Sequence, residues 1–353
     1  MNKKGPVTSL SRGRREAIRT ADVPALRWGF VGTGGIADAM AHVVATTPLA
    51  ALWAVSSRQM TNANEFADRY DVALRFDDWQ AMLDADDIDA IYVATPTSVR
   101  EEISIAAADA GKHVLAEKPF ASSASVKRIV AACRKNDVAF MDGTHFVHHP
   151  RHHEIRNGMD KLVGNPWSVA SAFQLDLPDR SDIRYDTALE PMGAIGDAGW
   201  YNMRAALEYL PKDAAPAFVE AVLRRDEETG AAISGSGIIQ YTDGSTTTWN
   251  CGFDSGALVM DLCITGFDGV IKIDNFLGQD EDGSATYLYK QGSWGPDVIR
   301  EARRVESGLS GAALMFEDFA VIAANAELRE DFALATLRTQ QLLDACWEAA
   351  TRA

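Results

Sequence analysis

The chain has 353 residues, of which 47% are hydrophobic and 24% are charged, and its formal net charge is −16 at pH 7. We expect a globular protein with two domains, since a domain usually spans about 100 to 200 residues. The negative charge would repel phosphate groups, which argues against nucleic acid and anionic membranes as main partners.

The first predicted segment is a basic N-terminal extension over residues 1–24. Its charged side chains are Lys3, Lys4, Arg12, Arg14, Arg15 and Arg19, against Glu16. We interpret it as a solvated, partly helical tail, because no apolar run long enough for an export signal follows Arg14 and Arg15. The four cysteines have no disulfide or metal spacing. No stretch reaches the roughly 18 consecutive apolar residues of a membrane span, so we expect a cytoplasmic protein.

Residues 25–146 alternate short apolar stretches with helical patterns. Strands are expected at RWGFVG, ALWAVSS, IDAIYVA, HVLAEKP and VAFMD. Helices are expected between them, for example at TNANEFADRY and SSASVKRIVAACRKND. Because strands that alternate with helices of this length form parallel crossover units, we predict an α/β Rossmann domain with a doubly wound sheet.

Residues 147–353 have a different pattern. WSVASAFQLDL alternates, with Trp167, Val169 and Phe173 on one face, which is typical of a half-buried strand. Asp243-Gly244 and Asp268-Gly269 are turn signals between further strands, and the chain is helical from Ala312 onward. We predict an α+β substrate and oligomerisation domain with a mostly antiparallel open sheet. An exposed face of this sheet would favour a homodimer, because an apolar open face needs to be covered.

A glycine turn follows the first strand in GTGGIA. Its residues are Gly32, Thr33, Gly34, Gly35 and Ile36, with Ala37 as the small residue where helix meets strand. Glycines at this point let a diphosphate approach the backbone amides of the helix N-terminus. The spacing departs from GxGxxG, but its place in the first crossover unit favours nucleotide binding over a merely structural turn.

The second strand ends in Ser56-Ser57-Arg58, where the residue that contacts the ribose is expected. An acidic residue here would accept from the 2′-hydroxyl of NAD, whereas hydroxyls and a guanidinium suit a 2′-phosphate. We therefore predict NADP as the preferred cofactor, with Ser57 and Arg58 as contacts and NAD as the other possibility. The alternative is that Arg58 stacks on the adenine or points to solvent.

Two further strands end in polar residues, Thr95-Pro96 and Glu117-Lys118-Pro119. In an open parallel sheet, the ligand crevice lies beyond the carboxyl ends of the strands. Lys118 could hydrogen-bond the substrate oxygen and stabilise a developing alkoxide. Glu117 could balance that charge or hold the cofactor ribose, and Pro119 fixes the backbone after the lysine.

GTGGIA, the AEKP segment and GAIGDAGWYNMRAAL together resemble the glucose-fructose oxidoreductase and inositol dehydrogenase family, called Gfo/Idh/MocA. The resemblance extends over nearly the whole chain from about residue 26. It implies a two-domain NAD(P)-dependent oxidoreductase that acts on a sugar, polyol or derivative, as a homodimer or homotetramer. It also implies that Lys118 is the catalytic and substrate-binding lysine.

Asp197 and Tyr201 lie four apart in the same segment, which would place them on one face of a helix. Many family members have Asp and then His at these positions. Tyr201 instead resembles the glucose-fructose oxidoreductase, xylose dehydrogenase and dihydrodiol dehydrogenase branch. A phenol needs a cationic neighbour to act near neutral pH, and Lys118 could be that neighbour. The alternatives are a helix-terminal acid and a core tyrosine.

Five histidines lie in HFVHHPRHH. Their spacing of four is compatible with metal binding if helical, but no carboxylate or cysteine completes a set nearby, so we predict no metal. Because the segment leaves the last parallel strand, we expect His145 and His148 to contact the substrate. Trp200, next to Tyr201, is the third residue that we expect to contact it.

These residues predict a hydride transfer between nicotinamide and a hydroxyl of a sugar or sugar derivative. Lys118 and Tyr201 would form the proton-transfer pair, and Asp197 would hold a neighbouring hydroxyl. One alternative is a tightly bound nucleotide used in a transient oxidation cycle on a glycoside or between two sugars. Another is a non-catalytic nucleotide-sensing protein. Aromatic alcohol oxidation would be favoured if Trp200, Phe146 and Trp167 line an apolar pocket.

Overall fold

The structure is a computed structural model that describes residues 23–211, 214–292, 294 and 297–352. The predicted basic extension, residues 1–24, lies outside the described residues except for its last two. The described chain forms two compact units. The first ends at His148 and also takes in Leu309–Leu337, and the second comprises His149–Gly308 and the chain from Arg338 onward.

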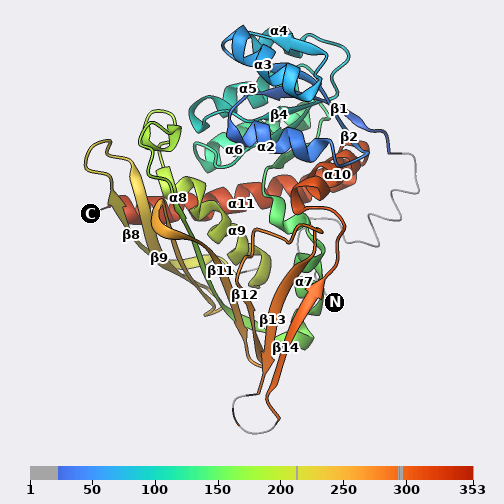
Figure 1. Ribbon diagram of the computed structural model, residues 1–353. Coiled ribbons are helices and arrows are strands. Elements are labelled where there is room, and N and C mark those ends of the chain that lie inside the picture. The colour runs from blue at the N-terminus through green and yellow to red at the C-terminus, as the bar shows by residue number, and fades with distance from the viewer. Residues whose placement is uncertain (1–22, 212–213, 293, 295–296, 353) are drawn as a thin grey trace. The chain divides into compact units, whose positions relative to one another are not determined.

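The first unit contains a six-stranded parallel sheet with the order β3-β2-β1-β4-β5-β6. Its strands are β1 (Leu26–Val31), β2 (Ala50–Ser56), β3 (Leu74–Phe76), β4 (Ala90–Val93), β5 (His113–Ala116) and β6 (Phe140–Asp142). The helices between them are α2 (Gly35–Val44), α3 (Met60–Tyr70), α4 (Trp79–Leu83), α5 (Thr97–Asp109) and α6 (Ser123–Lys135) (Figure 1). Every residue of β4 is buried, as expected for a parallel strand covered on both faces. The predicted Rossmann domain is confirmed.

Helix α10 (Gly311–Ala324) returns to the first unit from far along the chain. Phe316 and Phe319 each have their ring centroid 5.0 Å from that of Trp28 in β1. The helix is apolar on nearly all sides, so it must be covered on all sides, and the Rossmann sheet supplies part of that cover. The predicted boundary at residue 146 assigns this helix to the second domain, whereas it packs with the first unit. Helix α11 (Ala326–Thr351) then continues into the second unit.

The second unit contains an eight-stranded sheet with the order β14-β13-β12-β11-β7-β10-β9-β8. Its strands are β7 (Pro166–Asp176), β8 (Pro216–Arg225), β9 (Ala232–Tyr241), β10 (Thr246–Gly252), β11 (Asp254–Gly266), β12 (Gly269–Ile273), β13 (Ala285–Gln291) and β14 (Ile299–Val305). The β7–β10 pair is parallel and the other pairs of this described sheet are antiparallel, which confirms the predicted mostly antiparallel sheet. Asp243-Gly244 lies in the turn between β9 and β10, and Asp268 lies in the turn directly before Gly269, where β12 begins, so both turns are confirmed.

Helices of the second unit cover one face of this sheet. They are α7 (Pro150–Leu162), α8 (Gly193–Asp197) and α9 (Gly199–Tyr209). Two short 3₁₀ helices are also present: η1 (His145–His148) belongs to the first unit, and η2 (Ile183–Tyr185) belongs to the second. Val169 is buried on the covered face as predicted, but Trp167, near the start of β7, is 44% exposed. The predicted burial of Trp167 is therefore wrong. No helix among the described residues combines the length and hydropathy that a membrane crossing requires.

Candidate active site

The glycine turn joins β1 to α2. Gly32 has φ 112°, and a Cβ there would lie 2.5 Å from the carbonyl oxygen of Ala94, so only glycine fits. Around Gly34 and Gly35 a Cβ would meet no heavy atom within 4 Å. Gly34 is the N-cap of α2 and gives its amides no side-chain acceptor. Open space over exposed helix-terminal amides fits a diphosphate.

The end of β2 lies beside this turn. The Thr33 hydroxyl donates to the Ser57 hydroxyl, with 3.4 Å between the oxygens, and the Ser57 amide donates to the carbonyl of Phe76 at the end of β3. Arg58 follows as an exposed residue. The carboxyl ends of β1, β2 and β3 therefore bring together the glycine turn and the predicted ribose contacts. This fits the residues to a dinucleotide.

Glu117 is buried just after β5, with its carboxylate held from two sides. The Tyr92 hydroxyl in β4 donates to Oε1 at 2.6 Å, and the Lys118 amide donates to Oε2 at 3.3 Å. A Cβ at Gly143 would lie 2.6 Å from Oε1, so a side chain there would displace the carboxylate from this position. Burial raises the pKa of Glu117, while the Lys118 charge, the Tyr92 hydrogen bond and the Arg100 charge oppose that rise. Sequence reasoning missed Tyr92, whose only signal is a hydroxyl in an otherwise apolar strand.

The histidine segment divides between the two units. In the first, burial and then the charge of Lys118 lower the pKa of His145 to about 4, so His145 is neutral and lies near Lys118. His148 is buried, with Nδ1 2.6 Å from Oδ2 of Asp318 and its ring stacked on Phe332. That position favours a structural role for His148 over substrate contact. Among the described residues, no group of three or more His, Cys, Asp and Glu could hold a metal ion.

Asp197 and Tyr201 belong to two successive helices. Asp197 ends α8 and Tyr201 lies in the first turn of α9. The Tyr201 amide donates to the carbonyl of Ala198, three residues back, so the chain tightens at the junction where one continuous helix was expected. The Tyr201 ring packs edge-on against Phe173 of β7, with centroids 5.6 Å apart.

Arg184 of η2 is a partner of Asp197 that sequence reasoning missed. Its Nε donates to Asp197 Oδ2 at 2.6 Å, and its Nη1 lies 3.2 Å from Asp182 Oδ1. The Asp197 charge raises the pKa of Arg184, so the pair is ionic and Asp197 is a hydrogen-bond acceptor. Arg184 lies 13 residues before Asp197, and no periodic pattern in the sequence links the two positions.

Trp200 is fully buried, with the guanidinium of Arg204 5.9 Å from its ring centroid. Its predicted contact with substrate has less support than that of Tyr201, because a side chain closed off from solvent also lacks a surface for a ligand. Phe146 is buried as well, while Trp167 is exposed.

Residues 26–144 match the family described as "Oxidoreductase family, NAD-binding Rossmann fold" (GFO_IDH_MocA). The chain is 31% identical to dTDP-3,4-didehydro-2,6-dideoxy-alpha-D-glucose 3-reductase from Actinomadura kijaniata, over 66% of this chain and 70% of that protein. It is 30% identical to D-xylose 1-dehydrogenase (NADP(+)) 2 from Haloferax volcanii, over 65% of this chain and 70% of that protein.

A similar fold is known from crystal structures. A 3-ketoreductase from Actinomadura kijaniata in complex with NADP and TDP-benzene superposes with a TM-score of 0.83 at 26% identity, covering 91% of this chain and 96% of that one. The same family is indicated by these relatives, by the order of the strands in both sheets, by the glycine turn and by the Glu117-Lys118-Pro119 segment. The chain therefore belongs to the Gfo/Idh/MocA family of oxidoreductases.

Proposed function

We propose that this protein is an NADP-preferring oxidoreductase that transfers a hydride between nicotinamide and a hydroxyl of a sugar or sugar derivative. The observation that carries the proposal is Lys118, which follows β5 in the same parallel sheet as the open glycine turn. Ligands of such sheets bind beyond the carboxyl ends of the strands. Relatives that reduce a dTDP-sugar or oxidise D-xylose support the substrate class.

The cofactor, when bound, would supply or accept the hydride. The amides of Gly34 and Gly35 would bind its diphosphate, and Thr95, Pro96 and Glu117 would line the loops beside its nicotinamide half. Ser57 and Arg58 would bind the 2′-phosphate, because Ser56-Ser57-Arg58 offers hydroxyls and a guanidinium but no carboxylate. The NADP named for the xylose dehydrogenase is consistent with this preference.

Lys118 would stabilise the substrate alkoxide by its charge, and Tyr201 would accept the hydroxyl proton in the oxidative direction. Asp197, which accepts from Arg184 Nε at 2.6 Å, would also accept from a neighbouring sugar hydroxyl and orient it. His145, which stays neutral near Lys118, would contact the substrate without adding charge. These roles rest on the residues and the family resemblance.

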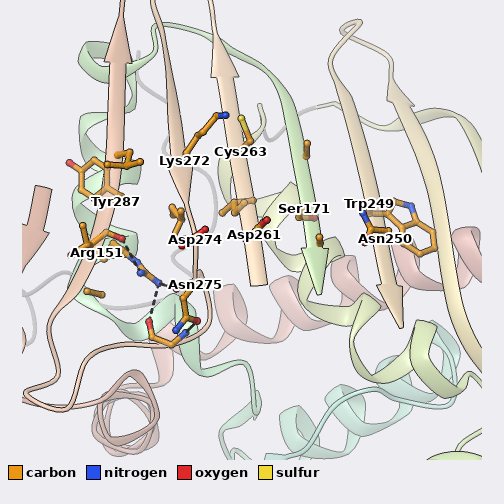
Figure 2. A pocket seen from close by; sticks show the side chains of 18 of the residues that line it. Arg151, Ser171, Trp249, Asn250, Asp261, Cys263, Lys272, Asp274, Asn275 and Tyr287 are labelled. Carbon is orange, nitrogen blue, oxygen red and sulfur yellow. Dashed lines mark hydrogen bonds between the residues drawn. The ribbon is translucent and has the colours of Figure 1, made fainter. Parts of the chain in front are cut away.

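We further propose that the open face of the second unit's sheet associates with a second copy of the chain, giving a homodimer or homotetramer. Phe218, Val222 and Ile238 are exposed there on β8 and β9. A hollow of about 1040 Å³ lies along the middle strands, where Asn250, Asp261 and Lys272 project (Figure 2). Sedimentation of Val222→Glu tests this: the variant should dissociate at concentrations where the parent is associated.

The reaction is tested by following reduced-nicotinamide absorbance with aldoses, polyols and dTDP-sugars under NADP and NAD, together with direct binding of each cofactor. The proposal predicts turnover of at least one sugar, faster with NADP, and loss of that preference in Arg58→Ala. Cofactor binding without turnover on any sugar would contradict it and favour a retained-nucleotide cycle or a sensor. Faster turnover with NAD would overturn the cofactor preference alone.

A further inference from the structure

Arg100 of α5 joins the loops that follow two neighbouring strands. Its Nη2 donates to the carbonyl of Thr95, after β4, and its Nη1 donates to the carbonyl of Pro119, after β5. Nη1 also donates to the Thr97 hydroxyl at 3.1 Å. The side chain is only 4% exposed. One planar guanidinium therefore bridges two backbone segments that are 24 residues apart in the chain, since its fixed fork of donors can point at two acceptors at once.

The two bridged loops are those on which the proposed chemistry depends. β4 and β5 are paired in parallel up to Val93 and Ala116, and the Glu117 amide still donates to the Val93 carbonyl. The described backbone pairing of β4 and β5 ends at that bond, and beyond it the Thr97 hydroxyl also donates to the Pro119 carbonyl at 3.5 Å. Lys118 is next to Pro119, and Thr95 is next to Pro96, so the Arg100 bonds fall where the strand ladder has ended. The Arg100 guanidinium links the two segments by hydrogen bonds just beyond the end of the strand pairing.

Arg100 also contributes charge to this region. The groups that act on the buried Glu117 carboxyl are Lys118 next to it, Tyr92 of β4 and Arg100 of α5. Both cations favour the ionised carboxylate, and that carboxylate accepts from the Lys118 amide at 3.3 Å. Arg100 therefore reaches the Lys118 segment through the Pro119 carbonyl, and its charge also acts on the neighbouring Glu117 carboxyl.

We propose that Arg100 is a positioning residue that fixes the Thr95 and Lys118 loops relative to each other and so holds Lys118 in its reactive place. The catalytic consequence rests on the proposed function. The bridge itself rests only on the observed hydrogen bonds of Arg100. The residue does not contact the reacting atoms. Its effect passes through the backbone on either side of Lys118.

The bridge is tested first by deuterium exchange on the cofactor-free chain. Arg100→Met removes all the donors, while Arg100→Lys keeps the charge but lacks the fork and serves if the methionine variant does not fold. Arg128→Met is the matched control, because Arg128 of α6 forms an ion pair at the surface with Glu101, the residue that follows Arg100 on α5. We expect exchange in residues 94–98 and 117–121 to quicken about tenfold in both Arg100 variants and not in the control. Unchanged exchange in either loop would overturn the bridge.

The catalytic consequence is tested with the same variants. Displacing Lys118 by a fraction of an ångström should lower kcat by roughly tenfold to a hundredfold, while KM for the sugar and Kd for NADPH change less than about threefold. A residue that only stabilises the fold would lower the melting temperature and leave the kcat of the folded enzyme unchanged, which would contradict positioning. If the parent converts no sugar, the proposed function fails, and the exchange result still decides the bridge.

Discussion

The Glu117-Lys118-Pro119 segment and the histidine segment, residues 145–153, both gather ionisable side chains in a short stretch, but the fold uses them differently. The first follows a parallel strand, and Lys118 keeps part of its surface in contact with solvent. In the second, four polar side chains are buried and each makes a specific contact: His148, His149, Arg151 and His152. The two segments therefore differ in burial and in contacts, although both are rich in ionisable side chains.

Contacts in the histidine segment show what those side chains do. His149 Nε2 lies 2.7 Å from the carbonyl oxygen of Gly283. Arg151 donates to the carbonyls of Asn275 and Phe276 at 3.0 and 2.7 Å. Figure 2 shows Arg151 beside Asn275. Burial lowers the pKa of Arg151 to about 10, which still leaves it charged at neutral pH. These bonds fix the loop between β12 and β13 to the start of α7, so they stabilise the second unit.

The largest expected effect in this comparison is in the buried cluster around Glu208. Its carboxylate Oε2 lies 3.3 Å from His152 Nε2 and 3.2 Å from Arg156 Nη1, and Oε1 lies 3.9 Å from Arg204 Nη1. Glu208→Gln leaves Arg156 and Arg204 without this counter-charge and should lower the free energy of unfolding by about 3–5 kcal/mol. Urea unfolding measures it, and turnover per folded molecule should not change.

Asp160→Asn on the exposed side of the same helix as His152 is the control, expected within about 0.5 kcal/mol of the parent. The cluster lowers the pKa of Glu208 to about 2 from an ordinary 4.5, despite its burial. A depressed carboxyl pKa stabilises the fold above pH 4.5, and that contribution is lost as the pH falls toward 2. A difference between parent and Glu208→Gln that persists undiminished at pH 2 would contradict this account.

A smaller effect is expected at Tyr92, which supports the Lys118 segment. Tyr92→Phe keeps the ring packing against Phe30, whose centroid is 4.7 Å away, and removes one hydrogen bond to a buried carboxylate. The expected loss of unfolding free energy is about 1–3 kcal/mol, measured by chemical denaturation. Tyr70→Phe, at a partly exposed hydroxyl in the same unit, is the control. Equal stability of parent and Tyr92→Phe would show that Glu117 does not depend on this donor.

The smallest effect is a pH dependence that arises from two histidines, His113 at the start of β5 and His145 in the histidine segment. Burial lowers the pKa of His113 and of His145 to about 4 from an ordinary 6.5. The unfolded chain therefore binds protons that the folded chain does not, and stability falls as the pH drops from 6.5 toward 4. Between pH 7 and pH 6 the loss should be below about 1 kcal/mol for each histidine. His145→Asn should flatten the measured slope, and an unaltered slope would exclude His145 as a contributor.

The Rossmann domain could be predicted because its signals are local. Apolar strands, the glycine turn and the strand-end residues at Thr95 and Glu117 follow one another in the chain, and parallel sheets bring strand ends together. Three contacts could not be predicted, because each depends on tertiary placement that no sequence periodicity encodes. They are Arg100 with Pro119, Arg184 with Asp197 and Tyr92 with Glu117. The return of α10 to the first sheet had the same obstacle. Its uniform apolarity indicated burial but not the surface that covers it.

The most direct test of the central claim compares turnover per folded molecule of Lys118→Met with that of the parent, on the sugar that the parent converts and with NADPH binding measured alongside. The account predicts a loss of roughly 10²–10⁴-fold in kcat with cofactor affinity and unfolding free energy close to those of the parent. Turnover of the variant equal to that of the parent would contradict the assignment of Lys118 as the catalytic lysine.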